Sequence, residues 1–137
     1  MTTNIMVAGK NSANVQLVKQ AVDQMDYQVI PVTSMSLALF LAQKNLPELV
    51  LCDADLLDGD PLSFLKELQA DNELRQIPFM LMTKKELSES DKKRLMSSGA
   101  ALILPSDISP REFLTTVEPY IEARLARKEE RLPETSE

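Results

Sequence analysis

The sequence contains no histidine, no tryptophan and one cysteine in 137 residues. Without histidine, the chain cannot form histidine-dependent catalytic triads, proton shuttles at neutral pH or imidazole-ligated metal sites. A lone cysteine cannot form an internal disulfide, so we expect a reducing, cytoplasmic compartment. The reactive groups that remain are carboxylates, lysines and hydroxyls.

Long apolar runs and an excess of positive charge are also missing. No apolar run approaches the roughly 20 residues that cross a bilayer, so we expect no membrane association. The formal net charge of -6 opposes binding to a phosphate backbone, and nucleic acid is not expected as a direct partner. The hydrophobic fraction of 44% and charged fraction of 26% are typical of one soluble globular domain.

Short apolar runs alternate five times with longer amphipathic segments. The apolar runs lie at 4–8, 27–32, 48–53, 78–82 and 101–104, and the segments that follow them lie at 12–25, 34–45, 61–72, 88–99 and 109–130. Within the third and fourth runs, residues 49–52 and 79–82 are apolar on both faces rather than alternating, as in parallel strands that helices cover on both sides. The pattern therefore predicts an α/β fold with a single doubly wound, five-stranded parallel sheet and five helices.

Local signals support these boundaries and suggest where the domain ends. Helix N-caps are predicted at four serines: Ser12, Ser34, Ser88 and Ser109. The segment 123–137 is highly charged and includes few apolar residues. We expect a domain at 1–122 and a charged C-terminal helix extension or tail at 123–137, with the last helix fraying into solvent.

Polar residues follow two of the predicted central strands. The carboxyl ends of parallel strands meet at one edge of a sheet, where the reactive groups of open α/β proteins gather. Asp53 closes the third apolar run and Thr83 closes the fourth, so both are predicted at this edge near Lys10. The stretch "CDADLLDGD" at 52–60 adds further carboxylates. A merely solvated acidic loop is the plain alternative.

Together, "PELVLCD", "IPFMLMT", "GAALIL" and "SPREF" resemble the receiver domain of two-component response regulators, over roughly residues 4–122. The resemblance implies a flavodoxin-like, CheY-like fold. It also implies that Asp53 stands at the phosphoacceptor position and Thr83 at the position that contacts the phosphoryl group.

The same resemblance marks several degenerate active-site positions. Where receivers usually carry an acidic pair that holds Mg²⁺, this sequence has Ala8 and Gly9, followed by Lys10. Ser106 stands at the position of the family's lysine, and Ile103 at that of the switching aromatic residue. The resemblance therefore implies a pseudo-receiver.

Two expectations concern the charge balance around Asp53. Asp53 with the backbone carbonyl of Asp55 would make a poor magnesium site, so Mg²⁺ should bind weakly and no other cofactor is expected. A carboxylate that is partly removed from water is stabilised by a nearby positive charge. Lys10 or Lys84 is therefore predicted to pair with Asp53. The alternative is that both lysines simply extend into water.

We expect a receiver-like signalling module, not an enzyme, that acts by protein–protein interaction, with phosphoryl transfer lost or weak. The alternative is a functional receiver phosphorylated on Asp53 in a two-component phosphorelay. A flavodoxin-like small-ligand binder is a third reading, but the chain has no glycine-rich cradle. The partner would be a separate protein, an attached output or kinase domain, or a second copy. In the family, partners dock on the face formed here by residues 90–99, 101–104 and 109–125.

Overall fold

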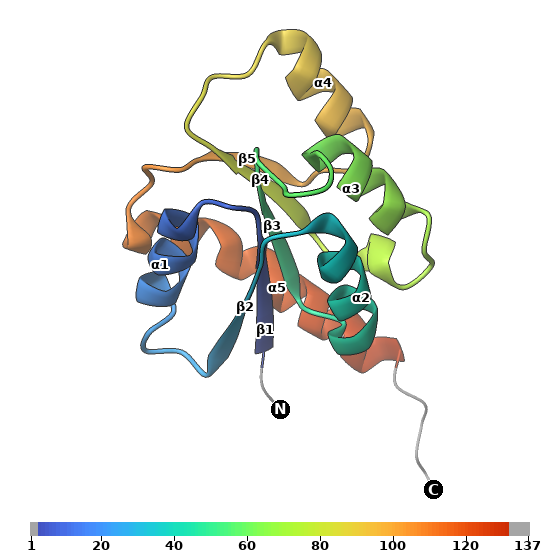
Figure 1. Ribbon diagram of the computed structural model, residues 1–137. Helices are drawn as coiled ribbons and strands as arrows, with labels where there is room; N and C mark the ends of the chain where they lie inside the picture. The colour runs from blue at the N-terminus through green and yellow to red at the C-terminus, as the bar shows by residue number, and fades with distance from the viewer. Residues whose placement is uncertain (1–2, 132–137) are drawn as a thin grey trace, which may run out of the picture.

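The computed structural model describes residues 3–131 and contains one parallel five-stranded sheet (Figure 1). The strands are β1 (Thr3–Ala8), β2 (Tyr27–Val32), β3 (Leu49–Asp53), β4 (Phe79–Thr83) and β5 (Leu102–Pro105). They lie in the order β2-β1-β3-β4-β5, with every neighbouring pair parallel. The chain crosses over after β2, which creates the switch point at which α/β proteins place their sites. The predicted doubly wound α/β sheet is confirmed.

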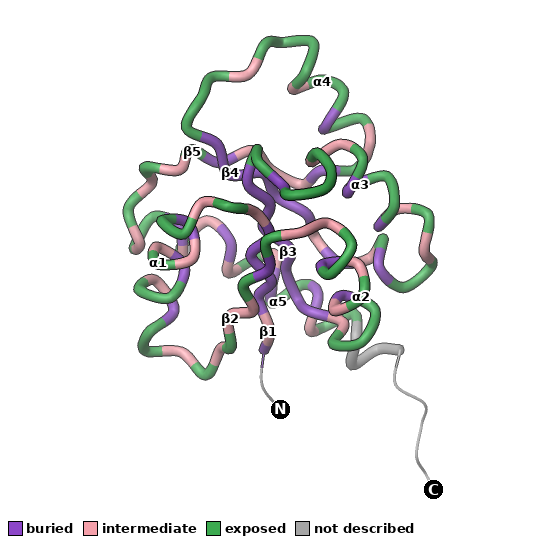
Figure 2. The backbone as a smooth tube through the Cα atoms, viewed as in Figure 1, coloured by how far each residue is buried: buried purple, intermediate pink, exposed green. Residues whose placement is uncertain are grey.

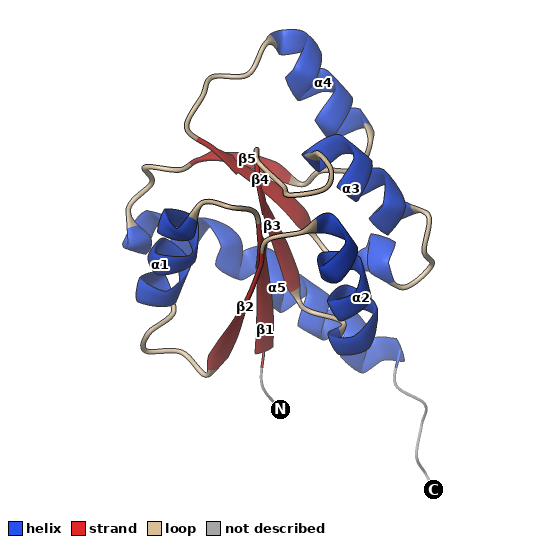
Figure 3. Ribbon diagram, in the orientation of Figure 1, coloured by secondary structure: helices blue, strands red, loops and turns tan. Residues whose placement is uncertain are grey.

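Five helices cover the two faces of the sheet (Figure 3). They are α1 (Ser12–Ala21), α2 (Met35–Asn45), α3 (Pro61–Gln69), α4 (Glu89–Ser97) and α5 (Pro110–Arg131), with a short 3-10 turn, η1 (Leu74–Gln76), after α3. Helices α1 and α5 pack on one face, and α2, α3 and α4 on the other. None of the helices described is both long and apolar enough to cross a bilayer.

Each face of the sheet has its own apolar core, and β3 and β4 are buried along their whole length (Figure 2). On one face, Phe113 of α5 is fully buried against the central strands. On the other, the rings of Phe64 and Phe79 meet edge to face with their centroids 5.9 Å apart. Such an arrangement suits the quadrupoles of two aromatic rings. The unbroken apolar sequence of β3 and β4 follows from their burial between these two cores.

The helix starts largely follow the capping residues. Ser34 and Ser88 accept hydrogen bonds from the backbone N–H groups of Leu37 and Asp91, and Ser109 caps α5 in the same way. The predicted cap at Ser12 is wrong, because Asn11 fills that role. The Asn11 side chain accepts from the N–H of Ala13 at 2.9 Å, and an amide oxygen satisfies such an orphan donor as well as a serine does.

The last helix runs past the proposed domain boundary at residue 122, as the predicted helical segment 109–130 does. Helix α5 continues without a break to Arg131, and Ile121 and Arg124 are both buried. The proposed division between 122 and 123 therefore falls inside α5, and fraying of the end of this helix stays a prediction. Residues 132–137 of the predicted tail lie outside the described residues.

Candidate functional site

A cavity of about 330 Å³ opens at the carboxyl ends of β1, β3 and β4. It is lined by eight residues from the three loops that follow these strands: Lys10, Asn11, Asp53, Ala54, Asp55, Thr83, Lys84 and Lys85. The cavity lining thus includes all the predicted site residues except Ala8, Gly9, Ile103 and Ser106, and Gly9 lies against the Asp53 side chain from outside this lining. The topology accounts for this, because β1, β3 and β4 are neighbours and all point the same way.

Asp53 is held by backbone amides at the end of β3. It is 8% exposed, and its carboxylate accepts hydrogen bonds from the N–H of Asn11 at 3.1 Å and of Ala54 at 2.6 Å. Asn11 is the N-cap of α1, so the carboxylate also faces the positive end of that helix. Two charge-assisted hydrogen bonds offset much of the cost of burying this carboxylate.

Gly9 lies directly against the Asp53 side chain. Its φ is +139°, and a Cβ atom built there would stand 2.2 Å from Asp53 Cβ. Ala8, one position earlier, is fully buried in the core and pairs with Cys52 across the sheet. Position 9 therefore has neither the backbone conformation nor the space for a carboxylate. The departure from the receiver pattern at Ala8 and Gly9 involves the backbone of the loop as well as its side chains.

The lysines surround Asp53 without pairing with it. Within residues 3–127, neither Lys10 nor Lys84 forms an ion pair with the Asp53 carboxylate, although both line its cavity. Lys10 contributes its backbone N–H to the carbonyl oxygen of Asp55 at 2.9 Å, which joins the β1–α1 loop to the β3–α3 loop. The predicted ion pair is thus not formed, because the neighbouring amides satisfy the carboxylate.

Thr83 is turned toward its own loop. Its Oγ1 donates to the carbonyl oxygen of Lys85 at 3.2 Å and accepts from the N–H of the same residue at 3.1 Å. Ser106 donates its backbone N–H to the carbonyl oxygen of Thr83 at 3.0 Å. Within the described part of the chain, the buried Ser106 Oγ has no hydrogen-bond partner. The short hydroxyl thus lies next to the β4 end but does not line the Asp53 cavity.

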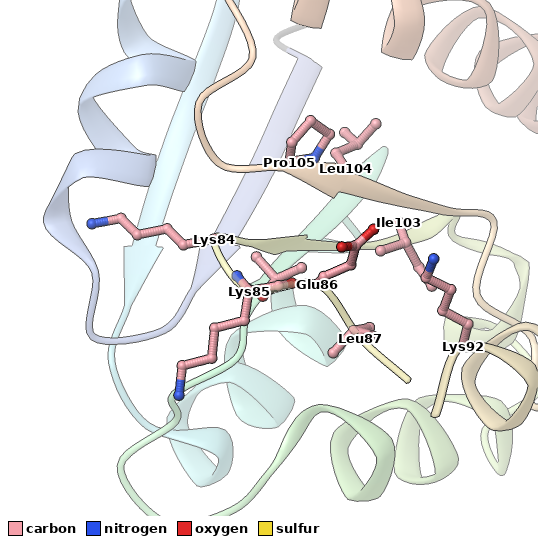
Figure 4. A pocket seen from close by; sticks show the side chains of 9 residues that line it. Lys84, Lys85, Glu86, Leu87, Lys92, Ile103, Leu104 and Pro105 are labelled. Atoms are coloured by element: carbon pink, nitrogen blue, oxygen red, sulfur yellow. Dashed lines mark hydrogen bonds between the residues drawn. The ribbon is translucent and has the colours of Figure 1, made fainter. Parts of the chain in front are cut away.

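Ile103 lines a second cavity, of about 520 Å³, together with Leu104 and Pro105 of β5 (Figure 4). Figure 4 shows Lys92 beside Ile103, whereas Lys84 and Lys85 extend away from them. Thr83, Lys84 and Lys85 line both cavities. The position expected for a switching aromatic residue therefore holds a half-buried aliphatic side chain with no polar end.

The residues around Asp53 do not fit a resident magnesium ion. Mg²⁺ requires near-octahedral oxygen ligation, usually with one or two carboxylates. Here both Asp53 oxygens accept backbone hydrogen bonds, Gly9 offers no side chain, and Lys10 brings a positive charge into the cavity. Among the described residues, no three His, Cys, Asp or Glu side chains gather closely enough to hold a metal ion.

Sequence reasoning missed the role of Asp58 in the same acidic stretch. Its carboxylate accepts from the backbone N–H of Met35 at 2.5 Å and of Ser36 at 3.2 Å, and from the Ser36 hydroxyl at 2.5 Å. The hydrogen bond from the Ser36 hydroxyl, together with those from the two amides, lowers the pKa of Asp58 below its usual range. Asp58 therefore joins the β3–α3 loop to the start of α2, a contact between distant segments that no local pattern indicates.

The strand order and the placement of Asp53 and Thr83 agree with a known protein family. The sequence matches the response regulator receiver domain over residues 5–118. The chain belongs to this receiver family. It is also 30% identical over 121 residues to the polar-differentiation response regulator DivK of Brucella ovis, and equally to that of Brucella abortus. The match covers 88% of this receiver and 98% of each relative.

Solved receiver structures have the same fold. The signal receiver domain of a putative LuxO repressor from Vibrio parahaemolyticus aligns with a TM-score of 0.86 at 16% identity, covering 97% of this receiver and 100% of that chain. The receiver domain of a sensor histidine kinase from Pseudomonas aeruginosa, solved with a coordinated magnesium ion, aligns with a TM-score of 0.76 at 20% identity, covering 89% and 99%. At these identities the likeness shows the fold alone, and the CheY-like prediction is confirmed.

Proposed function

We propose that this receiver of two-component signalling acts by binding a protein partner, with phosphoryl transfer to Asp53 lost or weak. It works in the cytoplasm as a binding module, without catalytic turnover and without a resident cofactor. The observation that carries the proposal is the contact between Gly9 and Asp53, with Lys10 on the rim of the same cavity. This arrangement leaves neither a second carboxylate nor room for one where the metal would bind.

The charge balance for a phosphoryl group supports the same conclusion. Ser106 supplies no fixed positive charge, and the Thr83 hydroxyl is engaged with the backbone of Lys85. An acyl phosphate on Asp53 would form through one carboxylate oxygen and so weaken the amide hydrogen bond that this oxygen now accepts. Each change raises the free energy of the phosphorylated state relative to the free carboxylate.

The proposed partner surface for signalling is formed by α4, β5 and α5. Helix α4 carries Lys92 and Arg94, each in an exposed ion pair within the helix, and Ile103 lines the cavity beside it. Exposed pairs of this kind contribute little to stability, so these charges are available to a partner. The partner is a separate protein or an attached output or kinase domain.

The alternative function is a working phosphoacceptor receiver. Two observations favour it: Asp53 stands at the end of β3, and Thr83 lines the same cavity. In that case the Asp53 carboxylate would attack a phosphodonor and form an acyl phosphate.

Intact-mass measurement after incubation with phosphoramidate and Mg²⁺ separates the two functions. We expect the native protein to remain unmodified, or to be modified in only a small fraction of molecules. In the Lys10→Asp variant, a larger fraction of molecules should be phosphorylated than in the native protein. The substitution replaces a cation at the cavity with a carboxylate that can bind Mg²⁺. Asp53→Asn is the control for the site of modification.

Stoichiometric addition of one phosphoryl group to the native protein, abolished in Asp53→Asn, would contradict the proposal and establish the alternative. If the native protein is unmodified, binding partners should be sought with the unphosphorylated chain. Asp53→Asn should then bind such a partner as well as the native protein does.

A further inference from the structure

Large apolar side chains are exposed mainly at one place on the described surface. Four are strongly exposed within residues 3–127, and three of these belong to α2 and the β3–α3 loop: Leu37 at 49%, Phe40 at 58% and Leu57 at 65%. The fourth, Met96 at 46%, lies on α4. Single exposed apolar residues are ordinary, whereas a contiguous group on a soluble domain marks an interaction surface.

Leu37 and Phe40 share one side of α2, and Leu57 is tied to the residues just before this helix. Leu37, Phe40 and Lys44 recur at the spacing of one helix face, whereas Ala38 and Ala42 face the core. Leu57 is held beside the first turn of α2, because its backbone N–H donates to the carbonyl oxygen of Thr33 at 3.0 Å. The Lys44 ammonium lies 5.8 Å from the centre of the Phe40 ring. We call this group, Leu37, Phe40, Lys44 and Leu57 with Asp58 beside them, the α2 surface.

The α2 surface carries little charge compared with α4. Lys44 is the only charged residue among the eleven of α2, whereas five of the nine residues of α4 are charged. Two chains that each carry a net charge of -6 repel one another. The α2 helix itself brings no carboxylate to such a contact, and Asp58 lies beside its first turn.

The α2 surface is also self-complementary. In an antiparallel pair of α2 helices centred on Phe40, Lys44 and Ser36 lie on opposite sides of the centre, each four residues or about 6 Å along the axis. Lys44 of one chain then faces the partner's Ser36, and Asp58 is hydrogen bonded to Ser36 at this end of the helix. A two-fold axis would thus place two Lys44–Asp58 pairs around a central pair of Phe40 rings.

From these observations we propose that the α2 surface is the interface of a homodimer in which two copies pack their α2 helices antiparallel. Phe40 is the central anchor, Leu37 and Leu57 flank it, and Lys44 pairs with the partner's Asp58. This interface lies away from the α4, β5 and α5 face, which remains open to another partner. The inference concerns assembly, and it stands whether or not Asp53 can be phosphorylated.

Sedimentation equilibrium of the full chain tests the proposal. From low micromolar to near-millimolar concentration, the apparent mass of the native protein should rise from 15.3 kDa toward twice that value. Phe40→Glu should raise the dissociation constant of the dimer by about tenfold or more, because it removes a central aromatic anchor. Met96→Glu makes the same change in charge on α4 and should leave the dissociation constant unchanged.

A cross-linking experiment reports the geometry. Phe40→Cys should form an intermolecular disulfide under mild oxidation, because two-fold symmetry brings the two positions together, whereas Met96→Cys should not. The native Cys52 is fully buried and does not interfere. Circular dichroism of each variant establishes that it is folded.

Three results would overturn the proposal. One is a native protein that stays monomeric over the whole concentration range. Another is a dimer that Phe40→Glu leaves intact. The third is a dimer that Met96→Glu disrupts, which would assign the contact to α4 instead.

Discussion

Gly9 shows how one residue can change the chemistry of a conserved site. Its backbone conformation, at a φ of +139°, is one that residues with a Cβ rarely adopt, and Asp53 occupies the space beside it. A change from a carboxylate to glycine usually leaves a gap. Here the loop has closed against Asp53 instead, and the carboxylate accepts the N–H of Asn11. The loss of metal binding that we propose would therefore follow from the backbone conformation as well as from the missing side chain.

We predict that Gly9→Ala lowers the free energy of unfolding by about 2 kcal/mol or more, through backbone strain and the clash with Asp53 Cβ. The urea midpoint at constant m-value measures this loss. Gly59→Ala is the matched control. Its added Cβ would meet the flexible end of Met35, at 2.6 Å from Sδ, and its cost should be below about 1 kcal/mol. Equal costs for the two variants would contradict the strain argument.

At the scale of elements, the β3–α3 loop does more than carry acidic residues. It accepts and donates hydrogen bonds with α2 and the residues before it, through Asp58 and through the N–H of Leu57. Asp58 lies at the positive end of α2, so its charge also complements the helix dipole. The loop that carries Asp53 at its start is thus anchored to α2, and movement of one requires adjustment of the other.

This anchor predicts a pH dependence of stability. The folded-state pKa of Asp58 lies below its unfolded value, so its stabilising contribution is present above about pH 4 and is lost as the pH falls through the folded-state pKa. Asp58→Asn should therefore give a flatter decline of the urea midpoint on acidification than the native protein. Recording both in the Phe40→Glu background excludes any effect of dimerisation.

Asp55→Asn is the control for this pH experiment, because it removes a carboxylate from the same loop without removing a hydrogen bond to α2. If the urea midpoints of the native and Asp58→Asn proteins declined equally steeply on acidification, the prediction would be contradicted.

The whole molecule is a three-layer sandwich whose centre is the pair β3 and β4. Cys52 lies in the middle of this centre, with no exposed surface. Burial, together with the negative charges of Asp53 and Asp60, raises the pKa of the Cys52 thiol far above its ordinary value. A thiol that cannot ionise is inert toward disulfides, so its reactivity reports the opening of the entire sheet.

We predict that the native protein does not react with a disulfide reagent at mildly alkaline pH, and that its reaction rate in urea follows the fraction unfolded. Ellman's reagent measures the rate. Met96→Cys places a thiol on the surface of α4 and should react at once without urea. Fast reaction of native Cys52 would show that β3 is exposed by a local opening.

Particular residues show how far sequence reasoning reached in the fold. The uninterrupted apolar runs of β3 and β4 predicted a covered parallel sheet, because only helices on both faces can bury such strands. Ser34, Ser88 and Ser109 were predicted as caps because capping is local, involving residues two or three apart. The cap of α1 was misplaced by one residue, since Asn11 and Ser12 are both able to cap a helix.

The sequence by itself determined the sheet, the placement of Asp53 and Thr83 at its edge, and the family, because alternating apolar periodicity and residues at strand ends are local features. The sequence also indicated the α2 surface, although we did not predict it. The segment 37–41 contains four large apolar residues, which is more than one buried face of a helix can accommodate: Leu37, Leu39, Phe40 and Leu41. Only the tertiary structure decided that amides rather than Lys10 or Lys84 hold Asp53, that Gly9 closes against it, and that Asp58 anchors α2. Apart from the amide of Ala54, those contacts join segments separated by more than 20 residues, and their geometry depends on how the loops pack together.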